Sequence, residues 1–117
     1  MALQGTCREV GDVAVLDFSG KITLGEGSST LRRMIRELIT SGHRKILLDL
    51  GDVDYIDSSG IGEMVAAYTT VRNAQGELKI VRLTKRVHDI LQITRLYTVF
   101  DVQLDEAGAL RSFRGAK

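Results

Sequence analysis

Apolar side chains recur along this chain with two different periods, and the way the periods alternate predicts a layered α/β fold. Strand-like runs occupy residues 3–10, 13–18, 45–50, 78–81 and 99–102. Amphipathic runs with the helical spacing i, i+3, i+4 and i+7 lie between and after the later strands. We therefore expect a mixed β-sheet that begins with a hairpin, continues with alternating helices and strands, and carries the helices packed on it.

The first third of the chain predicts a hairpin and a helix. Gly11 and Asp12 separate the first two strand-like runs and suit a two-residue turn. Ser28 or Ser29 is then expected to cap a first helix, and Gly42 to end it. The apolar face of this helix consists of Leu31, Met34, Ile35, Leu38 and Ile39.

The middle of the chain predicts a buried strand followed by a second helix. Residues 45–50 are almost continuously apolar, which is typical of a strand covered on both faces, and a loop is expected to continue to residue 56. The second helix is expected over residues 61–71, with Ser58 or Ser59 as its N-cap and Gly76 closing the turn after it. Its predicted buried side consists of Ile61, Met64, Val65, Tyr68 and Val71.

Two further helices are predicted after the strand at residues 78–81. Thr84 can cap a helix that carries Val87, Ile90 and Leu91, and Asp105 can start a C-terminal helix that continues through Leu110 and Phe113.

Composition narrows the class of protein. The 117 residues, 44% of them hydrophobic, are enough for one domain over residues 1–117 with its own core. A net charge of +1 creates no field that would collect nucleic acid or an anionic membrane, so the expected partner is a protein. Cys7 is the only cysteine, which excludes an intrachain disulfide and a cysteine-based zinc site. With no leader and no apolar run of about 20 residues, the protein is expected to be cytoplasmic and soluble.

Residues 57–62 are the most informative stretch for function. Ser58 and Ser59 stand at a predicted helix N-terminus, where free backbone N–H groups and the positive end of the helix dipole favour a phosphate. Gly60 and Gly62 lack Cβ atoms and would let a partner backbone approach the hydroxyls, although they can equally serve packing inside the chain. Helix-end statistics alone favour a purely structural cap for the serines.

The stretch Asp57-Ser58-Ser59-Gly60-Ile61-Gly62, after a strand that ends at Leu50 and a loop that ends at Ile56, resembles the signature of bacterial anti-sigma factor antagonists of the STAS domain class. The resemblance extends from residues 18–22 to residues 96–100 and implies a STAS-like α/β domain. In that family the serine directly after the aspartate is phosphorylated by a serine kinase that is also the anti-sigma factor. The matching residue here is Ser58.

The resemblance further implies a partner-switching cycle. The unphosphorylated antagonist binds the anti-sigma factor and frees a sigma factor, and a metal-dependent serine phosphatase reverses the modification. Phosphate on Ser58 would add about −1.5 to −2 charges and change the contact surface, whereas a helix N-terminus tolerates that charge. The residues expected to contact the partner are Thr23, Asp57, Ser58, Ser59, Gly60, Ile61 and Gly62.

Two residues depart from the family pattern. Members often carry an acidic residue where Thr23 stands, in a loop expected at the same end of the sheet as Ser58, and the departure makes acceptance by the kinase less secure. Many members have glycine where Arg95 stands, at a helix exit where a positive φ would cost a non-glycine residue about 1 kcal/mol.

The carboxylates before the second helix suggest an alternative to the switch, a metal site. Four nearby carboxylates resemble a receiver-type magnesium site, but residues 18–20 at the end of the second strand supply no acidic pair to complete it. These carboxylates belong to Asp49, Asp52, Asp54 and Asp57. No nucleotide-binding loop, zinc helix or serine–histidine pair is evident, so we expect no catalytic residue, metal or cofactor.

Three hypotheses remain from the sequence. The favoured one is the phosphorylated antagonist, and the alternatives are a non-switching STAS scaffold or subunit of a larger complex, and a phosphate- or nucleotide-binding enzyme. The basic stretch on and after the first helix fits a solvated helix face or a partner contact. It comprises Arg32, Arg33, Arg36, His43, Arg44 and Lys45.

Overall fold

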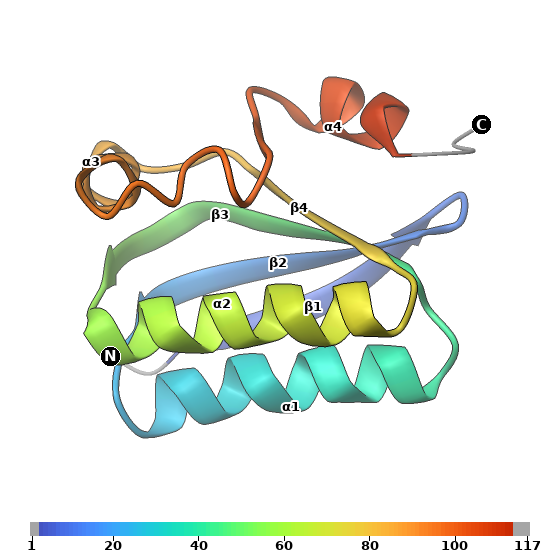
Figure 1. The fold of residues 1–117 in the computed structure, drawn as a ribbon, viewed down its shortest axis with the longest axis horizontal. Helices are drawn as coiled ribbons and strands as arrows, with labels where there is room; N and C mark the ends of the chain where they lie inside the picture. The colour runs from blue at the N-terminus through green and yellow to red at the C-terminus, as the bar shows by residue number, and fades with distance from the viewer. Residues whose placement is uncertain (1–2, 114–117) are drawn as a thin grey trace.

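The computed structural model describes residues 3–113, which form a five-stranded sheet with helices on both faces. The strands are β1 (Gln4–Val10), β2 (Val13–Ile22), β3 (Lys45–Ile56), β4 (Glu77–Val81) and β5 (Val102–Gln103). The helices are α1 (Glu26–Thr40), α2 (Ser58–Asn73), α3 (Lys85–Ile93) and α4 (Glu106–Ser112). Figure 1 shows α1 and α2 side by side under one face, with α3 and α4 over the other. The predicted α/β class is confirmed.

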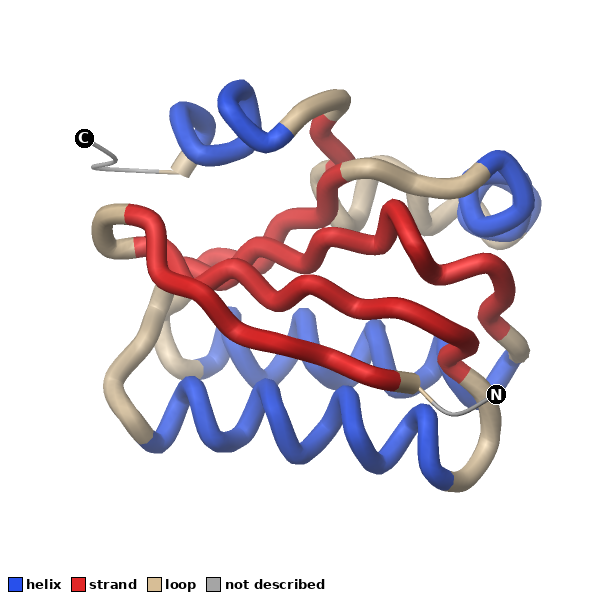
Figure 2. The backbone as a smooth tube through the Cα atoms, turned by 180° about the vertical axis from the view of Figure 1, so that it is seen from behind, coloured by secondary structure: helices blue, strands red, loops and turns tan. Residues whose placement is uncertain are grey.

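The sheet is mixed, and its strands lie in chain order. β1 pairs with β2 antiparallel across the two-residue turn, and each later strand pairs parallel with the one before it. The near edge of the sheet in Figure 2 is β1, which has no further strand beside it among the described residues. Parallel neighbours are joined by crossovers, because a parallel connection has to return along the sheet.

Burial follows the two faces of the sheet. Leu16, Leu48 and Ile80 point to the side of α1 and α2 and belong to the main core, which contains the buried faces of both helices. On the other face, Val15 and Leu47 lie in a smaller apolar cluster completed by α4. Residues 45–50 are thus covered on both sides, as their apolar run predicts.

Strands β2 and β3 are longer than the sequence predicts. The expected ends at Phe18 and Leu50 are wrong, because both strands continue side by side to Ile22 and Ile56. Their parallel register shifts at two places between Asp17 and Lys21. Such irregularities re-aim side chains and disrupt the alternation by which a strand is recognised in a sequence.

The caps of α1 and α2 also differ from the expectation. Gly25 precedes α1, so Ser28 and Ser29 lie within the helix and do not cap it. The cap of α2 is Asp57, and the serines after it are already helical. A capping carboxylate that precedes the serines by one or two residues has taken the position assigned to their hydroxyls.

Smaller corrections concern side chains and the last strand. Val65 is exposed, and Ala67 takes its place on the buried side of α2. The last strand comprises only Val102 and Gln103, since the segment before it forms a turn. Arg95 has φ 62°, as its position at a helix exit predicted. No helix in the described range has the length and apolar character needed to cross a bilayer.

Candidate functional site

The N-terminus of α2 is anchored by the carboxylate of Asp57. Its Oδ1 accepts a hydrogen bond from the Gly60 N–H at 2.8 Å, and its Oδ2 accepts one from the Leu24 N–H at 3.1 Å. These backbone hydrogen bonds, with Gly60 as the larger contributor, hold the pKa of Asp57 below its ordinary value. The Asp57 N–H in turn donates to the Ile22 carbonyl at 3.2 Å. One residue therefore ties α2 to the end of β2 and to the loop that follows it.

Because Asp57 provides the cap, the hydroxyls of Ser58 and Ser59 are not needed to cap α2. Ser58 is exposed and Ser59 is half-buried. Within residues 3–113 neither hydroxyl forms a hydrogen bond. Both stand in the first turn of α2, at the positive end of its dipole, which favours a negative group.

The two glycines of this turn have different surroundings. A Cβ atom on Gly60 would lie 2.0 Å from the Ile22 carbonyl oxygen, so Gly60 is needed for packing inside the chain. A Cβ atom on Gly62 would meet nothing within 4 Å. Of the two, only Gly62 presents an open backbone to an approaching partner, and the packing alternative holds for Gly60.

The loop from β2 to α1 lies against the same turn, as the sequence predicts for Thr23. The Thr23 carbonyl accepts hydrogen bonds from the N–H and the Oγ of Ser28, both at 3.0 Å. Leu24 has 78% of its surface exposed although its N–H is bound to Asp57. An open hollow of about 450 Å³ between the starts of α1 and α2 is lined by Leu24 and Ser59, among others.

Charged groups also line this hollow, and an aromatic residue lies near the end of β3. Arg32 of α1 donates to Glu63 of α2 at 2.7 Å and so joins the two helices. Tyr55, near the end of β3, has Lys21 and Arg86 each 6.0 Å from its ring centroid. Sequence reasoning missed Leu24 and Tyr55, because an isolated apolar residue is recognisable as a surface feature only from its exposure.

Three of the four aspartates that suggested a magnesium site have separate partners. Asp49 binds Arg82, Asp54 binds Lys21 at 3.1 Å, and Asp57 caps α2. Among residues 3–113, no three histidine, cysteine, aspartate or glutamate side chains come together as a possible metal site. The carboxylates of Asp49, Asp54 and Asp57 therefore belong to separate polar contacts.

The basic stretch on and after α1 is largely paired as well. Arg33 donates to Glu37 at 3.4 Å, and His43 contacts Glu9 at 3.1 Å. Lys45 pairs with Asp12 in the hairpin turn. These ion pairs fit the solvated-face interpretation of the stretch.

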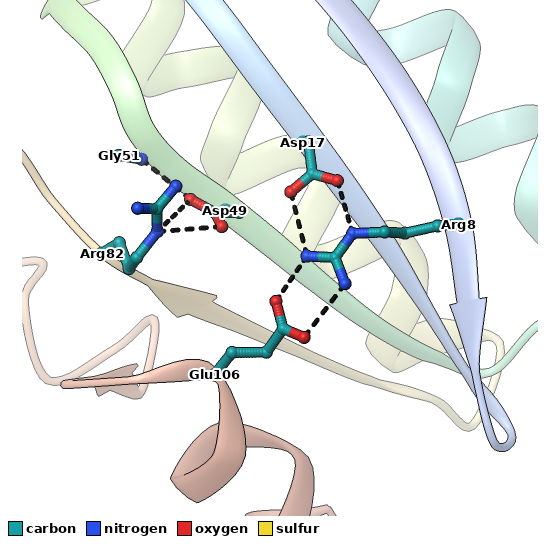
Figure 3. Close-up of polar contacts among 6 residues, drawn as sticks. All are labelled: Arg8, Asp17, Asp49, Gly51, Arg82 and Glu106. Atoms are coloured by element: carbon teal, nitrogen blue, oxygen red, sulfur yellow. Dashed lines mark hydrogen bonds and ion pairs between the residues drawn. The ribbon is translucent and has the colours of Figure 1, made fainter.

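The face of the sheet between α3 and α4 carries a polar cluster that the sequence did not predict (Figure 3). Arg8 binds Asp17 at 2.7 Å and also holds Glu106 at the start of α4. Next to it, the Arg82 Nε donates to the buried carboxylate of Asp49 at 3.0 and 3.1 Å. Arg8 and Asp17 come from the two strands of the hairpin, whereas Arg8 and Glu106 are 98 residues apart and Arg82 and Asp49 are 33 residues apart.

Gly51 makes room for the second half of this cluster. A Cβ atom there would lie 2.8 Å from the Arg82 guanidinium, and the Gly51 N–H donates to Asp49 at 3.0 Å. Arg82 itself has φ 56°, in the left-handed region. Such an arrangement cannot be predicted from a short sequence motif, because Asp49 and Arg82 are 33 residues apart.

Comparison with proteins of known sequence gives relatives over much of the chain. BtrV of Bordetella bronchiseptica, a candidate anti-sigma factor antagonist, is 31% identical over 78 residues, 67% of either chain. A candidate antagonist of Thermotoga neapolitana is 28% identical over 106 residues, 91% of this chain and 94% of its own. The anti-sigma-B factor antagonist of Bacillus subtilis is 32% identical over 62 residues, 53% of this chain and 57% of its own.

Solved structures agree with the fold. The crystal structure of a candidate anti-sigma factor antagonist from Thermotoga maritima superposes with a TM-score of 0.86 at 23% identity, covering 94% of each chain. The phosphorylated form of the Bacillus cell fate determinant SpoIIAA has a TM-score of 0.69 at 15% identity, covering 92% of this chain and 98% of its own. At these identities the likeness concerns the fold alone.

A family model described as the STAS domain matches residues 6–109, which include most of the hairpin, all the helix–strand crossovers and the turn before α2. The resemblance noted in residues 57–62 is thereby confirmed by a match over most of the chain. The chain belongs to the STAS domain family.

Proposed function

We propose that the chain is an anti-sigma factor antagonist, and that phosphorylation of Ser58 switches its binding to an anti-sigma factor that is also the kinase. The observation that carries this proposal is the division of tasks in the α2 turn. Asp57 supplies the cap and Gly60 the packing, whereas the exposed Ser58 hydroxyl has no hydrogen-bond partner among the residues that the structure describes. A hydroxyl in that position is accessible to a kinase and dispensable for the fold.

The proposed switch acts through charge at a surface. A phosphoryl group adds about −1.5 to −2 charges beside the Asp57 carboxylate, whose lowered pKa keeps it ionised. The N-terminus of α2 stabilises added negative charge, so the fold tolerates the modification. A partner that packs its own carboxylates or carbonyl oxygens against Ser58 then meets repulsion and the cost of desolvating a dianion.

The surface offered to the partner would include Thr23, Asp57, Ser58, Ser59, Ile61 and Gly62. Leu24, whose N–H binds Asp57, and Tyr55, two residues before Asp57, would add exposed apolar area to this surface. The buried Gly60 would act indirectly, through the position of the α2 backbone. In this proposal the chain is a substrate of a kinase and of a metal-dependent serine phosphatase in the cytoplasm, and it has no catalytic site of its own.

The first experiment locates the phosphate. Incubation with the cognate anti-sigma factor kinase and ATP, followed by fragment mass spectrometry, is expected to place the phosphoryl group on Ser58. Ser58→Ala should abolish the modification, and the matched control Ser59→Ala should retain it. Phosphate found mainly on Ser59 or Thr23 contradicts the assignment.

The second experiment measures binding to the same unphosphorylated partner by calorimetry. Ser58→Asp is expected to bind at least about tenfold more weakly than wild type, a loss of roughly 1.4 kcal/mol, while Ser58→Ala should still bind. Ser59→Asp adds the same charge one residue further on and should weaken binding less. If the phosphorylated protein and Ser58→Asp both bind as well as wild type, the non-switching scaffold replaces this proposal.

A further inference from the structure

Within residues 3–113, no strand pairs with the outer side of the edge strand β1. It pairs with β2 along its whole length in a continuous register of seven residue pairs, from Gln4 opposite Ser19 to Val10 opposite Val13. Five of its seven residues are exposed. Of the features that usually protect an edge strand, β1 has two charged side chains, Arg8 and Glu9, but no proline, no lysine and no bulge.

The hairpin turn determines which backbone groups of β1 face outward. Val10 and Val13 close a two-residue turn in which Gly11 has φ 61°, so these two valines exchange backbone hydrogen bonds. In an antiparallel pair, hydrogen-bonded and non-hydrogen-bonded positions alternate. The N–H and C=O groups of Gly5, Cys7 and Glu9 therefore point away from β2, toward the open edge.

This outward set is symmetric about Cys7, the middle residue of the strand. We propose that β1 is a homodimerisation edge, which pairs antiparallel with β1 of a second copy about a two-fold axis at Cys7. In this register Cys7 faces Cys7 of the second copy, and Gly5 faces Glu9 of the second copy. Each of these facing pairs has both N–H and both C=O groups available for ladder hydrogen bonds.

The charges of β1 are compatible with this register. Arg8 would face Thr6 of the second copy and Glu9 would face Gly5, so no like charges lie opposite each other. Both charges are also engaged within their own chain, Arg8 with Asp17 and Glu106, and Glu9 with His43. An axis at Arg8 or at Glu9 would instead bring two identical charges together, which disfavours those registers.

The assembly closes at two copies. At the other edge of the sheet, β5 has only two residues and offers little for pairing. An interface in which the same strand meets itself about a two-fold axis leaves no further copy of β1 free. The dimer would be a continuous sheet, and it does not depend on the state of Ser58.

Mass measurement tests the dimer under reducing conditions. Light scattering across a concentration series should approach twice the monomer mass of 12.9 kDa for the wild type. Cys7→Pro should stay near 12.9 kDa, because it removes an outward N–H and leaves the hydrogen bonds to β2 in place. Cys7→Ser keeps the N–H and should still dimerise.

Cross-linking tests the register and does not depend on the proline variant. A short bismaleimide, used at alkaline pH because burial and nearby carboxylates raise the pKa of Cys7, should join two wild-type chains. In the matched control Cys7→Ser/Glu9→Cys, the two thiols would be four residues out of register. We expect its yield to be at least about fivefold lower, since each residue of offset adds about 3.3 Å.

The outcomes separate the possibilities. A mass that remains at 12.9 kDa at every concentration overturns the proposal, as does a dimer that survives a folded Cys7→Pro variant. Equal cross-linking of the two thiol positions overturns the Cys7-centred register and indicates random collision. A concentration-dependent dimer with preferential cross-linking at Cys7 supports it, even if Cys7→Pro fails to fold.

Discussion

At the scale of single residues, Asp57 separates stability from modification. Its carboxylate holds both the first turn of α2 and the Leu24 backbone, so the neighbouring serine hydroxyl carries no cap. Ser58→Ala should therefore change the free energy of unfolding by no more than about 0.5 kcal/mol, as for other exposed positions without structural contacts. If the serine were the cap, phosphorylation of its Oγ would also disturb the hydrogen bond that stabilises the helix.

The Asp57 cap predicts a pH dependence of stability. Its pKa is lowered in the folded protein, so its charge contributes fully above the ordinary value of 3.8, and the contribution is lost as the pH falls through the lower folded value. Asp57→Asn keeps a capping side chain but lacks the charge. Urea unfolding should show the variant less stable than wild type at neutral pH, with the gap closing in acid.

The control for this effect is Ser58→Ala, whose difference from wild type should not vary over the same pH range. A gap between Asp57→Asn and wild type that persists unchanged in strong acid would show that the cap acts through shape alone.

The two glycines of the α2 turn form a matched pair for a second prediction. Gly60→Ala places a Cβ atom against the Ile22 carbonyl and should destabilise the protein by about 1–3 kcal/mol, as overpacking does. Gly62→Ala points into open space and should stabilise it by roughly 0.5–1 kcal/mol, because alanine favours a helix. Denaturant unfolding of both variants measures these changes in the free energy of unfolding. An equal loss of stability in the two variants would contradict the prediction.

At the scale of elements, strand β3 supplies the centre of the sheet. Leu48 is 1% exposed and belongs to the main core, so Leu48→Ala should cost about 2–5 kcal/mol in chemical denaturation. Leu104 is 88% exposed, and Leu104→Ala should stay within about 0.5 kcal/mol of wild type. If Leu48→Ala changed the free energy of unfolding as little as Leu104→Ala does, the assignment of this strand to the core would be wrong.

The sequence predicts those elements whose buried residues form a regular apolar pattern within one segment of the chain. The apolar faces of α1 and α3 and the continuous run in β3 were found because each is a local periodicity. The far half of β3 was mistaken for a loop, because its partner on β2 is displaced by two register shifts. Its pairing is a property of two strands, and neither strand shows it alone.

The candidate site divides in the same way. A contiguous motif predicts Ser58 and its neighbours, whereas the second hydrogen bond of Asp57 comes from the N–H of Leu24, 33 residues earlier in the chain. The cluster around Arg8 was not predicted at all, since its partner Glu106 is 98 residues away. Sequence reasoning from periods and motifs does not reach contacts at such separations.

At the scale of the whole molecule, Arg8 joins the first strand to the last helix. Arg8→Ala removes both contacts with Glu106, so α4 should open more often, with hydrogen exchange over residues 106–112 faster by up to about fivefold. Arg33→Ala, which removes an ion pair within α1, should leave α4 unchanged. Equal acceleration of exchange in β4 and α4 would indicate global destabilisation instead.

The order of the strands has a consequence for how the protein is made. Because β1 to β5 lie in the sheet in the order in which they occur in the chain, each strand emerging from the ribosome finds its neighbour already synthesised. No strand has to insert later between two strands that are already in the sheet. The sheet can thus grow outward from the hairpin during translation, and α4, which follows β5 in the chain, then covers apolar residues on the second face of the sheet.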